Sequence, residues 1–407
     1  MRVLFVNRFF HPDHSATSQM LTDLANDLSL AGVDVSVITS RQLIDNPHAA
    51  LEHRERAGGV DVHRVWSTRF GRRSLVARGL DYLSFYLSAG WRLGRVCRRG
   101  DVVVAKTDPP LISVVAAWAA RRRGAVLVNW LHDLFPEIAE RLGVAMMRGW
   151  LYRTLRRVRD RSLQRARCNV VIGSRMAEQV GALGVPADRV RIIHNWSDGD
   201  AIRPLPRSQN VLRAAWKLED RFVVAYSGNM GYAHEFDTVI DAAARLRARA
   251  DIVFLFVGGG VRRAHLEQEA ARRMLENVAF EPYQPRARLG ESLAVGDVHL
   301  VSLRPCLEGL MVPSKFYAVA AAGRPVLFVG DAHGELARLI ETGGCGASVS
   351  PGDGEALARH IVALAGDSAR CEAQGAAARR LFEARFERRL AVADWRRALE
   401  AAAGTRA

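Results

Sequence analysis

The feature that most constrains the fold of this chain is a regular alternation of short β-branched runs with longer stretches of helical period. In the first half, strands are predicted at 2–6, 34–39, 60–65, 101–105, 125–130, 168–172 and 190–193, and helices near 16–31, 73–99, 111–123, 147–166 and 174–183. In the second half, strands are predicted at 222–226, 252–257, 278–280, 297–301, 325–329 and 346–349, with helices between them. Apolar strands that alternate with helices indicate parallel sheets covered on both faces.

The polar stretch 195–206, which contains Pro and Gly, lies between the two halves and is typical of a linker. We expect an α/β protein with two doubly wound Rossmann-like domains, 1–200 and 201–385, that face each other across a cleft. A further helix at roughly 383–402 could pack under either domain. Ligands of such sheets bind at the carboxyl ends of the strands, so the loops after the strands are where chemistry is expected.

Composition excludes several classes of protein. Hydrophobic residues make up 49% and charged residues 25%, which argues against long disorder, a collagen-like repeat or a coiled coil. The five cysteines are never spaced as CxxC, so neither a disulfide framework nor a zinc site is indicated. No segment reaches the roughly 18 apolar residues of a membrane span. We therefore expect a cytoplasmic protein without a signal peptide.

The net charge of +15 is concentrated in the first half of the chain. Residues 1–200 hold 30 Lys and Arg against 19 Asp and Glu, whereas residues 201–407 hold 28 against 24. Nearly all of the positive charge is Arg, which makes an Arg-rich nucleic-acid-binding protein one alternative. No known nucleic-acid-binding module is present, so we expect no nucleic-acid partner.

Two loops of the second half have the features of a phosphate site. The strand at 222–226 leads into a turn with Gly228 and Gly231, where the backbone can approach a phosphate closely, although a plain turn has the same composition. After the strand at 297–301, Pro313 suits the first position of a helix, which places Lys315 in the first turn. A lysine there is unfavourable unless an anion is bound, because the helix dipole is already positive at that end. We therefore favour a phosphate ligand over a solvated surface lysine.

Other loops supply further candidates. Glu308 can accept hydrogen bonds from sugar hydroxyls. The loops 257–260 and 281–283 follow neighbouring strands and can enclose a nucleobase. In the first half, His132 and Asp133 follow a strand, where a His–Asp pair is either structural or catalytic.

At these loops the chain resembles the retaining GT-B glycosyltransferases of family 4, particularly those that build O-antigen, colanic acid and related surface polysaccharides. The matching segments are WLHDLFPEIAERLGV, IIHNWSD, YSGNMGYAHEFDTVIDAA, FLFVGGG, NVAFEPYQPRARLGESLAVGDVHLVSL and LEGLMVPSKFYAVAAAGRPVL. The resemblance implies a nucleotide-sugar donor, with a UDP-sugar favoured over a GDP-sugar, and a final helix within 386–407 that returns to the first domain. The implied donor-binding residues are Gly228, Asn229, Gly231, His234, Gly258, Gly259, Pro282, Tyr283, Met311, Val312, Pro313 and Ser314.

The resemblance also implies roles for the candidate catalytic residues. Lys315 and backbone N–H groups would stabilise the departing diphosphate, so neither a metal nor a cofactor is expected. Glu308 would position the donor sugar, and His132, with Asp133 beside it, would orient the acceptor. The chain departs from the family pattern where a second acidic residue is expected, since Ala318 stands there, and His234 stands near a missing Arg/Lys pair.

The segment 73–99 predicts a membrane partner. On a helical wheel, Arg92, Arg95 and Arg99 cluster on one side with Asp81, Ser84 and Ser88, and the apolar residues Val76, Leu80, Leu83, Leu87, Trp91 and Leu93 lie opposite. Burial in the core is the alternative. The neighbouring aromatic residues and Arg72, Arg73, Arg98 and Arg99 favour peripheral binding to the anionic inner face of the cell membrane, where a lipid-linked glycan acceptor would lie. A sugar-nucleotide epimerase of the same architecture, which needs no acceptor site, is the other enzyme alternative.

Overall fold

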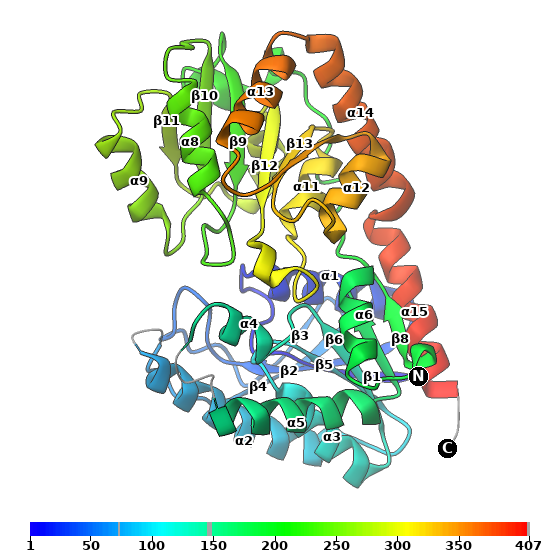
Figure 1. The fold of residues 1–407 in the computed structure, drawn as a ribbon. Coiled ribbons are helices and arrows are strands. Elements are labelled where there is room, and N and C mark those ends of the chain that lie inside the picture. The colour runs from blue at the N-terminus through cyan, green and yellow to red at the C-terminus, as the bar shows by residue number, and fades with distance from the viewer. Residues whose placement is uncertain (72–73, 145–148, 405–407) are drawn as a thin grey trace. The chain divides into compact units, whose positions relative to one another are not determined.

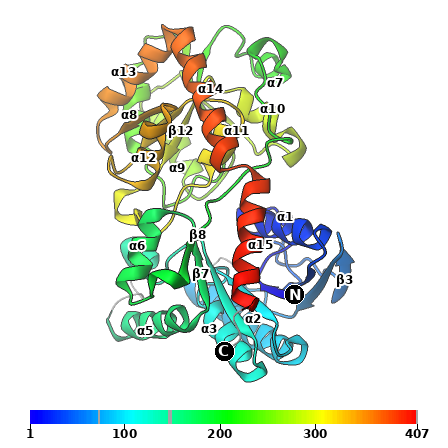
Figure 2. The ribbon, with the colours of Figure 1, turned by 90° about the vertical axis from the view of Figure 1, so that its right-hand side faces the viewer.

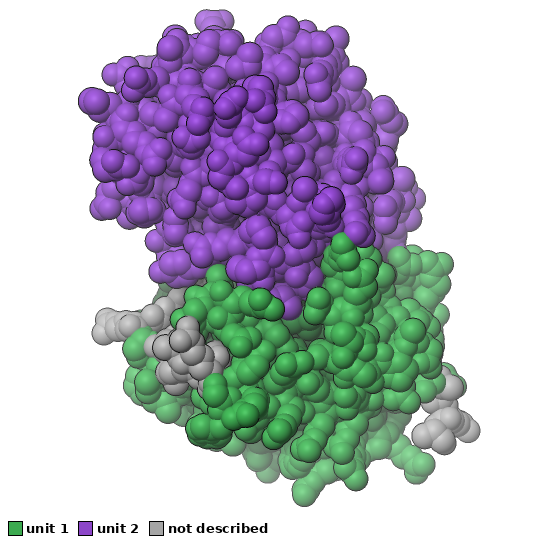
Figure 3. All heavy atoms as spheres, in the orientation of Figure 1, with its two compact units in different colours: residues 1–193, 392–407 green, residues 194–391 purple. Residues whose placement is uncertain are grey.

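The computed structural model describes residues 1–71, 74–144 and 149–404. The chain divides into two compact units, which Figure 3 shows in different colours. Unit 1 comprises residues 1–193 and 392–407, and unit 2 comprises residues 194–391. Arg72, Arg73 and the start of the helix predicted at 147–166 fall outside the described residues.

Unit 1 contains an eight-stranded sheet in the order β3-β4-β2-β1-β5-β6-β7-β8. All neighbouring strands are parallel except β3 and β4. The strands are β1 (Arg2–Val6), β2 (Asp34–Ser40), β3 (Arg54–Ala57), β4 (Val60–Val65), β5 (Val102–Lys106), β6 (Val126–Leu131), β7 (Cys168–Val171) and β8 (Val190–Ile192). Seven of these strands match the sequence prediction. Six of them have mostly buried side chains, whereas the residues of the edge strand β8 are exposed or half-buried.

Strand β3 was not predicted from the sequence. Its four residues, Arg-Glu-Arg-Ala, are exposed or half-buried and carry no apolar pattern, since the strand lies at the edge of the sheet. Gly58 and Gly59 join it to β4 with φ angles of 58° and 82°. Two consecutive residues with positive φ are typical of a tight hairpin. The Gly-Gly pair is therefore the one sequence feature that indicates a hairpin between β3 and β4.

Helices cover both faces of the unit 1 sheet (Figure 1). They are α1 (Ala16–Leu30), α2 (Leu75–Val96), α3 (Ile112–Arg123), α4 (Glu137–Arg141), α5 (Gly149–Arg165) and α6 (Ser174–Ala182). Helix α3 packs beside both α2 and α5. Only the short helix α4, which follows Pro136, was not predicted.

Unit 2 contains a six-stranded, fully parallel sheet in the order β11-β10-β9-β12-β13-β14. Its strands are β9 (Phe222–Ser227), β10 (Ile252–Val257), β11 (Val278–Glu281), β12 (Val298–Ser302), β13 (Val326–Val329) and β14 (Gly346–Val349). Its helices are α7 (Val211–Ala215), α8 (Asp237–Arg245), α9 (Arg263–Arg272), α10 (Leu289–Ala294), α11 (Lys315–Ala321), α12 (Glu335–Gly343), α13 (Gly354–Ala365) and α14 (Ser368–Arg385). Two doubly wound Rossmann-like sheets are therefore present, as the strand pattern predicted.

The end of the chain differs from the single helix predicted at roughly 383–402. Helix α14 ends at Arg385, and α15 (Arg388–Gly404) begins after a two-residue break (Figure 2). The Glu387 carboxylate in this break accepts a hydrogen bond from Gly199 N–H at 3.2 Å. From Val392 onward the helix belongs to unit 1, where the Trp395 ring packs 4.6 Å from the Trp130 ring centroid. None of the described helices combines the length and apolar composition that crossing a membrane requires.

Candidate functional site

Two glycine-containing loops, after β9 and β10, meet the end of β11 at the carboxyl edge of the unit 2 sheet. Gly228 N–H, after β9, donates to Val257 O at 2.8 Å, and Gly258 N–H, after β10, donates to Glu281 O at 2.9 Å. A Cβ atom at residue 258 would lie 2.3 Å from Gly228 O. Gly228 and Gly258 also have φ angles of 123° and 134°, which side-chain-bearing residues rarely adopt. These two predicted positions therefore need glycine for the loops to pack together.

Lys315 reaches into this cluster of loops from the first residue of α11. Its Nζ lies 3.0 Å from His234 Nε2 and 5.1 Å from the centroid of the Tyr226 ring. A Cβ atom at residue 228 would lie 2.8 Å from Lys315 Cε. The structure thus brings together three residues that the sequence singled out separately, namely Gly228, His234 and Lys315.

The hydrogen bonds of His234 define the tautomer of its ring. Its Nδ1 lies 2.7 Å from Ser302 O, and since a carbonyl can only accept, Nδ1 carries the proton. Nε2 is then the acceptor that faces the Lys315 ammonium group. Burial and the nearby Lys315 charge lower the pKa of His234 to about 3, so the ring is neutral at physiological pH.

Burial lowers the pKa of Lys315 to about 7. No ion pair joins this lysine to a carboxylate within the part of the chain that the structure describes. A bound anion would favour the charged form of the lysine and raise its pKa. The surroundings of Lys315 therefore suit an anionic ligand, which is what its place at a helix start predicted.

The other predicted donor-binding residues lie in the same loops. Met311, Val312, Pro313 and Ser314 directly precede α11, so the helix begins two residues after Pro313 rather than at it. Asn229 and Gly231 follow β9, where Asn229 O accepts a hydrogen bond from Tyr226. Pro282 and Tyr283 follow β11, and a Cβ atom at Gly259 would lie 3.2 Å from Tyr283 Cε2. The Tyr283 ring is 58% exposed and therefore open to a stacking ligand.

Glu308 makes a contact that its place in the sequence did not reveal. Its Oε1 accepts a hydrogen bond from Glu335 N–H, at the first residue of α12, at 2.7 Å. A Cβ atom at Gly334 would lie 2.6 Å from Glu308 Oε2, so the carboxylate is packed tightly against this helix start. A carboxylate is stabilised there by the positive end of the helix dipole.

Arg263 was missed by the sequence analysis. Its Nη1 donates to Gly258 O at 2.5 Å and to Glu281 O at 3.0 Å, so it links the loops after β10 and β11. Nothing in the local sequence distinguishes this arginine from its neighbour Arg262, because its second acceptor, Glu281 O, is brought close only by the pairing of β10 with β11.

A second cluster lies at the carboxyl edge of the unit 1 sheet. Lys106 ends β5, and His132 and Asp133 follow the neighbouring strand β6. Lys106 Nζ lies 3.2 Å from the centroid of the Trp130 ring. Lys106 Nζ and His132 Nε2 are both buried, and neither has a hydrogen-bond partner among the described residues. The sequence does not single out Lys106, because its burial against Trp130 depends on the pairing of β5 with β6.

Burial controls the protonation of this cluster. Burial and the Lys106 charge hold the pKa of His132 well below its usual value, so His132 is neutral. Burial also lowers the pKa of Lys106, and burial together with Asp108 raises the pKa of Asp133 to about 6. The side chains of Lys106, His132 and Asp133 are therefore polar groups with little net charge, and a ligand hydroxyl can form hydrogen bonds with them.

A cavity of about 80 Å³ lies at the same edge of unit 1, lined in part by Arg8, Gln42, Arg78, Tyr82 and Asp108. Arg8 Nη2 donates to Gln42 Oε1 at 3.2 Å, and the Arg8 Nε atom has no partner among the described residues. Arg78 Nε donates to the Tyr82 hydroxyl at 2.6 Å. Two guanidinium groups and the carboxylates of Asp81 and Asp108 therefore border one small cavity, and Arg8 Nη2 lies 3.5 Å from Asp81 Oδ2.

Helix α2 has the apolar face that the wheel predicted, and it is not buried in the core. Its exposed apolar residues, between 45% and 68% exposed, are Val76, Leu80, Leu83, Leu87 and Trp91. Leu93, which the wheel placed with them, is fully buried. Asp81 and Ser84 of the predicted polar side are also buried, because Asp81 accepts hydrogen bonds from the Thr68 hydroxyl and from Phe70 N–H. Arg92 also differs from the prediction, because its Nη2 lies 2.8 Å from His63 Nδ1 in unit 1. Arg95 lies over the Trp91 ring at 4.0 Å and remains exposed.

Within residues 1–71, 74–144 and 149–404, no three His, Cys, Asp or Glu side chains are grouped as metal ligands. All five cysteines are free, as their spacing indicated.

Comparison with known proteins identifies the family. Residues 16–196 match the glycosyl transferase 4-like domain, and residues 221–367 match the glycosyl transferases group 1. The chain is 29% identical to the probable glycosyltransferase WbjE of Pseudomonas aeruginosa, over 74% of this chain and 75% of that protein. It is 27% identical to the putative colanic acid biosynthesis glycosyl transferase WcaI of Escherichia coli K12, over 89% of this chain and 91% of that protein.

Solved structures share the fold. The UDP complex of HepE from Anabaena has a TM-score of 0.73 at 17% identity and covers 98% of this chain and all of that one. The sucrose-phosphate synthase of Thermosynechococcus elongatus has a TM-score of 0.78 at 17% identity, over 99% of this chain and all of that one. The two family models together span most of both units. The chain therefore belongs to the family 4 glycosyltransferases and is an enzyme of the GT-B fold.

Proposed function

We propose that this enzyme transfers a sugar from a UDP-sugar, with retention at the anomeric carbon, to a lipid-pyrophosphate-linked glycan in surface polysaccharide synthesis. The observation that carries the proposal is the placement of Lys315 against His234 and Gly228, where a diphosphate would meet a lysine and closely packed backbone. HepE, which shares the fold, has been solved with UDP and with UDP-glucose, which favours uridine as the donor base. The similarity to WcaI favours a polysaccharide product.

The chemistry requires stabilisation of a leaving diphosphate. The bond between the sugar C1 and the β-phosphate oxygen breaks, and its electron pair stays on that oxygen. Lys315 and the N–H groups at the start of α11 stabilise the negative charge that develops. The acceptor oxygen bonds to C1 on the same face, and its proton passes to the departing phosphate. Because the protein itself supplies the positive charge, we propose that transfer needs neither a metal nor a cofactor.

In this proposal Glu308 positions the donor sugar. The hydrogen bond from Glu335 N–H orients its carboxylate, and sugar hydroxyls can donate to the lone pairs of the same group. The contact strengthens as the sugar gains positive charge in the transition state, so it contributes more to turnover than to binding.

Unit 1 holds the acceptor in this proposal. His132 and Asp133 lie at its sheet edge with polar atoms that a glycan hydroxyl can satisfy. An anionic group of the acceptor is placed in the cavity beside Arg8, which also pairs with Asp81 at 3.5 Å, and Arg78, because guanidinium groups bind phosphate oxygens in bidentate fashion. A pyrophosphate-linked acceptor carries such a group, whereas a neutral glycan does not.

The exposed face of α2 supports a peripheral location on the inner side of the cell membrane. Five apolar side chains lie on this face, and Trp118 of the adjacent helix α3 is 50% exposed, with Arg122 over its ring at 4.8 Å. Tryptophan and leucine beside arginine are typical of helices that lie in a bilayer interface.

Calorimetric titration of the full chain with UDP, GDP and dTDP tests the donor assignment. We expect UDP to bind most tightly, and the corresponding sugar nucleotides to support transfer with retention, which NMR of the product anomer would show. Tighter binding of GDP would reassign the donor base, and an inverted product would contradict the proposed chemistry.

A further inference from the structure

A large pocket lies at the opposite edge of the unit 2 sheet from Lys315. Its volume is about 840 Å³, within the usual range of roughly 300–1,000 Å³ for small-molecule sites. Its wall includes Phe222, which begins β9, together with Asp297 and Pro325, which directly precede β12 and β13. The pocket is therefore formed at the amino ends of these strands, whereas the glycine loops follow their carboxyl ends.

Arginine dominates the charge of this pocket. Arg207, Arg324, Arg379 and Arg380 line it, against the two acidic residues Asp297 and Glu372. Arg379 already pairs with Glu383 at 2.7 Å and Arg207 with Asp297 at 3.5 Å, which leaves Arg324 and Arg380 as the positive groups of the wall without an ion pair among the described residues.

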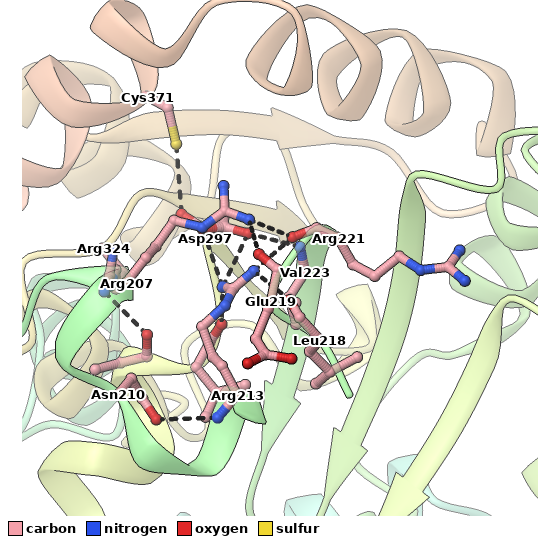
Figure 4. Close-up of polar contacts among 12 residues, drawn as sticks. Arg207, Asn210, Arg213, Leu218, Glu219, Arg221, Val223, Asp297, Arg324 and Cys371 are labelled. Atoms are coloured by element: carbon pink, nitrogen blue, oxygen red, sulfur yellow. Dashed lines mark hydrogen bonds and ion pairs between the residues drawn. The ribbon is translucent and has the colours of Figure 1, made fainter. Parts of the chain in front are cut away.

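The Asp297 carboxylate is held mainly by Arg213 and the backbone, and it also forms an ion pair with Arg207. Both of its oxygens lie 3.2 Å from Arg213 Nη1, and Oδ2 accepts from Val223 N–H at 2.7 Å (Figure 4). Arg213 itself is fully buried and lies outside the pocket wall. The Arg207 Nε atom pairs with Asp297 Oδ1 at 3.5 Å, and its Nη2 donates to Glu219 O at 3.2 Å and to Arg221 O at 2.6 Å, while the side chain remains 46% exposed.

Arg324 is positioned by the backbone rather than by an acid. Its Nη2 donates to Leu205 O at 2.7 Å and to Ala294 O at 2.9 Å. Its Nε is buried and has no hydrogen-bond partner among the described residues. A guanidinium group held by carbonyl oxygens keeps its full positive charge, which an anion in the pocket would compensate.

The rest of the wall is apolar, with Leu205, Pro206, Phe222, Pro325 and Leu364 among its members. An inorganic anion would make no contact with this apolar surface, and a purely apolar ligand would leave the arginines without a counter-ion. A molecule that joins a phosphate to an apolar group can both pair with the arginines and pack on the apolar wall.

We propose that this pocket is a second ligand site of unit 2, which binds an organic phosphate with an apolar substituent. The ligand's phosphate lies against Arg207, Arg324 and Arg380, and its apolar part packs on Phe222 and the neighbouring prolines. Because this site and Lys315 lie at opposite edges of one sheet, both can be occupied at once. Binding here does not depend on the proposed donor or acceptor.

Calorimetric titration of the full chain with geranyl phosphate tests the proposal, with inorganic phosphate and geraniol as the two partial probes. We expect geranyl phosphate to bind more tightly than either partial probe. Ala376→Trp fills the pocket from α14, and Arg380→Glu reverses one of its charges. Each substitution should weaken geranyl phosphate binding by about tenfold or more.

Matched controls lie on the same helix. Ala384→Trp and Arg370→Glu change exposed residues of α14 outside the pocket wall and should leave binding unchanged. Saturating UDP should not displace geranyl phosphate. The proposal is overturned if geranyl phosphate does not bind, if the controls weaken it equally, or if UDP competes with it. It is also overturned if Leu83→Ser on α2 abolishes binding while Ala376→Trp does not, since the probe then binds the exposed face of α2.

Discussion

Lys315 Nζ donates to the unprotonated Nε2 of His234 across 3.0 Å, so the cation at the start of α11 is paired with a neutral ring rather than with an acid. A neutral partner leaves the charge of Lys315 available to a ligand. The same arrangement explains why burial can lower the pKa of this lysine to about 7, since no carboxylate opposes the effect of desolvation.

This pairing predicts that nucleotide binding takes up a proton above pH 7. In the free enzyme Lys315 is increasingly neutral as pH rises through about 7, whereas the bound β-phosphate favours its charged form. UDP affinity should therefore fall as pH increases from 7 to 9. The neighbouring groups do not titrate in this window, because burial lowers the pKa of His234 to about 3 and raises that of Tyr226. Titrations in buffers of different ionisation enthalpy count the protons, and a constant affinity across this range would contradict the prediction.

Glu308→Gln should lower transfer more than nucleotide binding. The amide oxygen of glutamine can still accept from Glu335 N–H, so α12 should stay in place, but the charge that favours a positively charged sugar is lost. Steady-state transfer and UDP affinity are compared for this variant and for Glu341→Gln, an exposed control on α12. Equal losses of transfer and UDP affinity would assign Glu308 to the nucleotide instead.

His132→Ala should reduce transfer while UDP affinity stays nearly unchanged, because we place His132 beside the acceptor in unit 1. The exposed residue His48 offers a matched control through His48→Ala. An increase in the apparent KM for acceptor would agree with the assignment. A loss of UDP affinity without any effect on acceptor use would show that His132 contacts the donor instead of the acceptor.

Membrane binding should depend on the exposed face of α2. The double substitution Leu83→Ser and Leu87→Ser, and separately Arg95→Glu, should weaken flotation with anionic liposomes, and added salt should weaken it further. Leu30→Ser on α1 changes a leucine that is 85% exposed and serves as the control. Flotation that is independent of anionic lipid, of salt and of these variants would leave α2 as an ordinary surface helix.

The fold could be predicted from the sequence where burial determines the residue pattern. Strand β10 is apolar throughout, and β1 is apolar after Arg2, because both faces of these strands are covered. Strand β3 lies at an edge and carries charged residues, so its pairing with β4 leaves no apolar pattern. The break between α14 and α15 was missed because Glu387 is held by Gly199, far away in the chain.

Site residues could be predicted where the neighbouring residues in the sequence alone indicate their chemical role. Lys315 was identifiable because a lysine at a helix start is unfavourable by itself. Arg263 and the bond between Glu308 and Glu335 were not identifiable, since their partners are brought close only by the packing of neighbouring strands. Lys106 was missed for the same reason, as its burial against Trp130 depends on the pairing of β5 with β6.

The most direct measurement is the affinity of Lys315→Ala for UDP, with Lys217→Ala as the control for an exposed lysine of the same unit. Removing one charge-assisted contact to a phosphate should cost about 1.5–3 kcal/mol, so calorimetry should show UDP binding weakened by roughly 10- to 150-fold in Lys315→Ala. Turnover should fall as well, and Lys217→Ala should behave as the unmodified enzyme. An Lys315→Ala variant with unchanged UDP affinity and unchanged turnover would contradict the account.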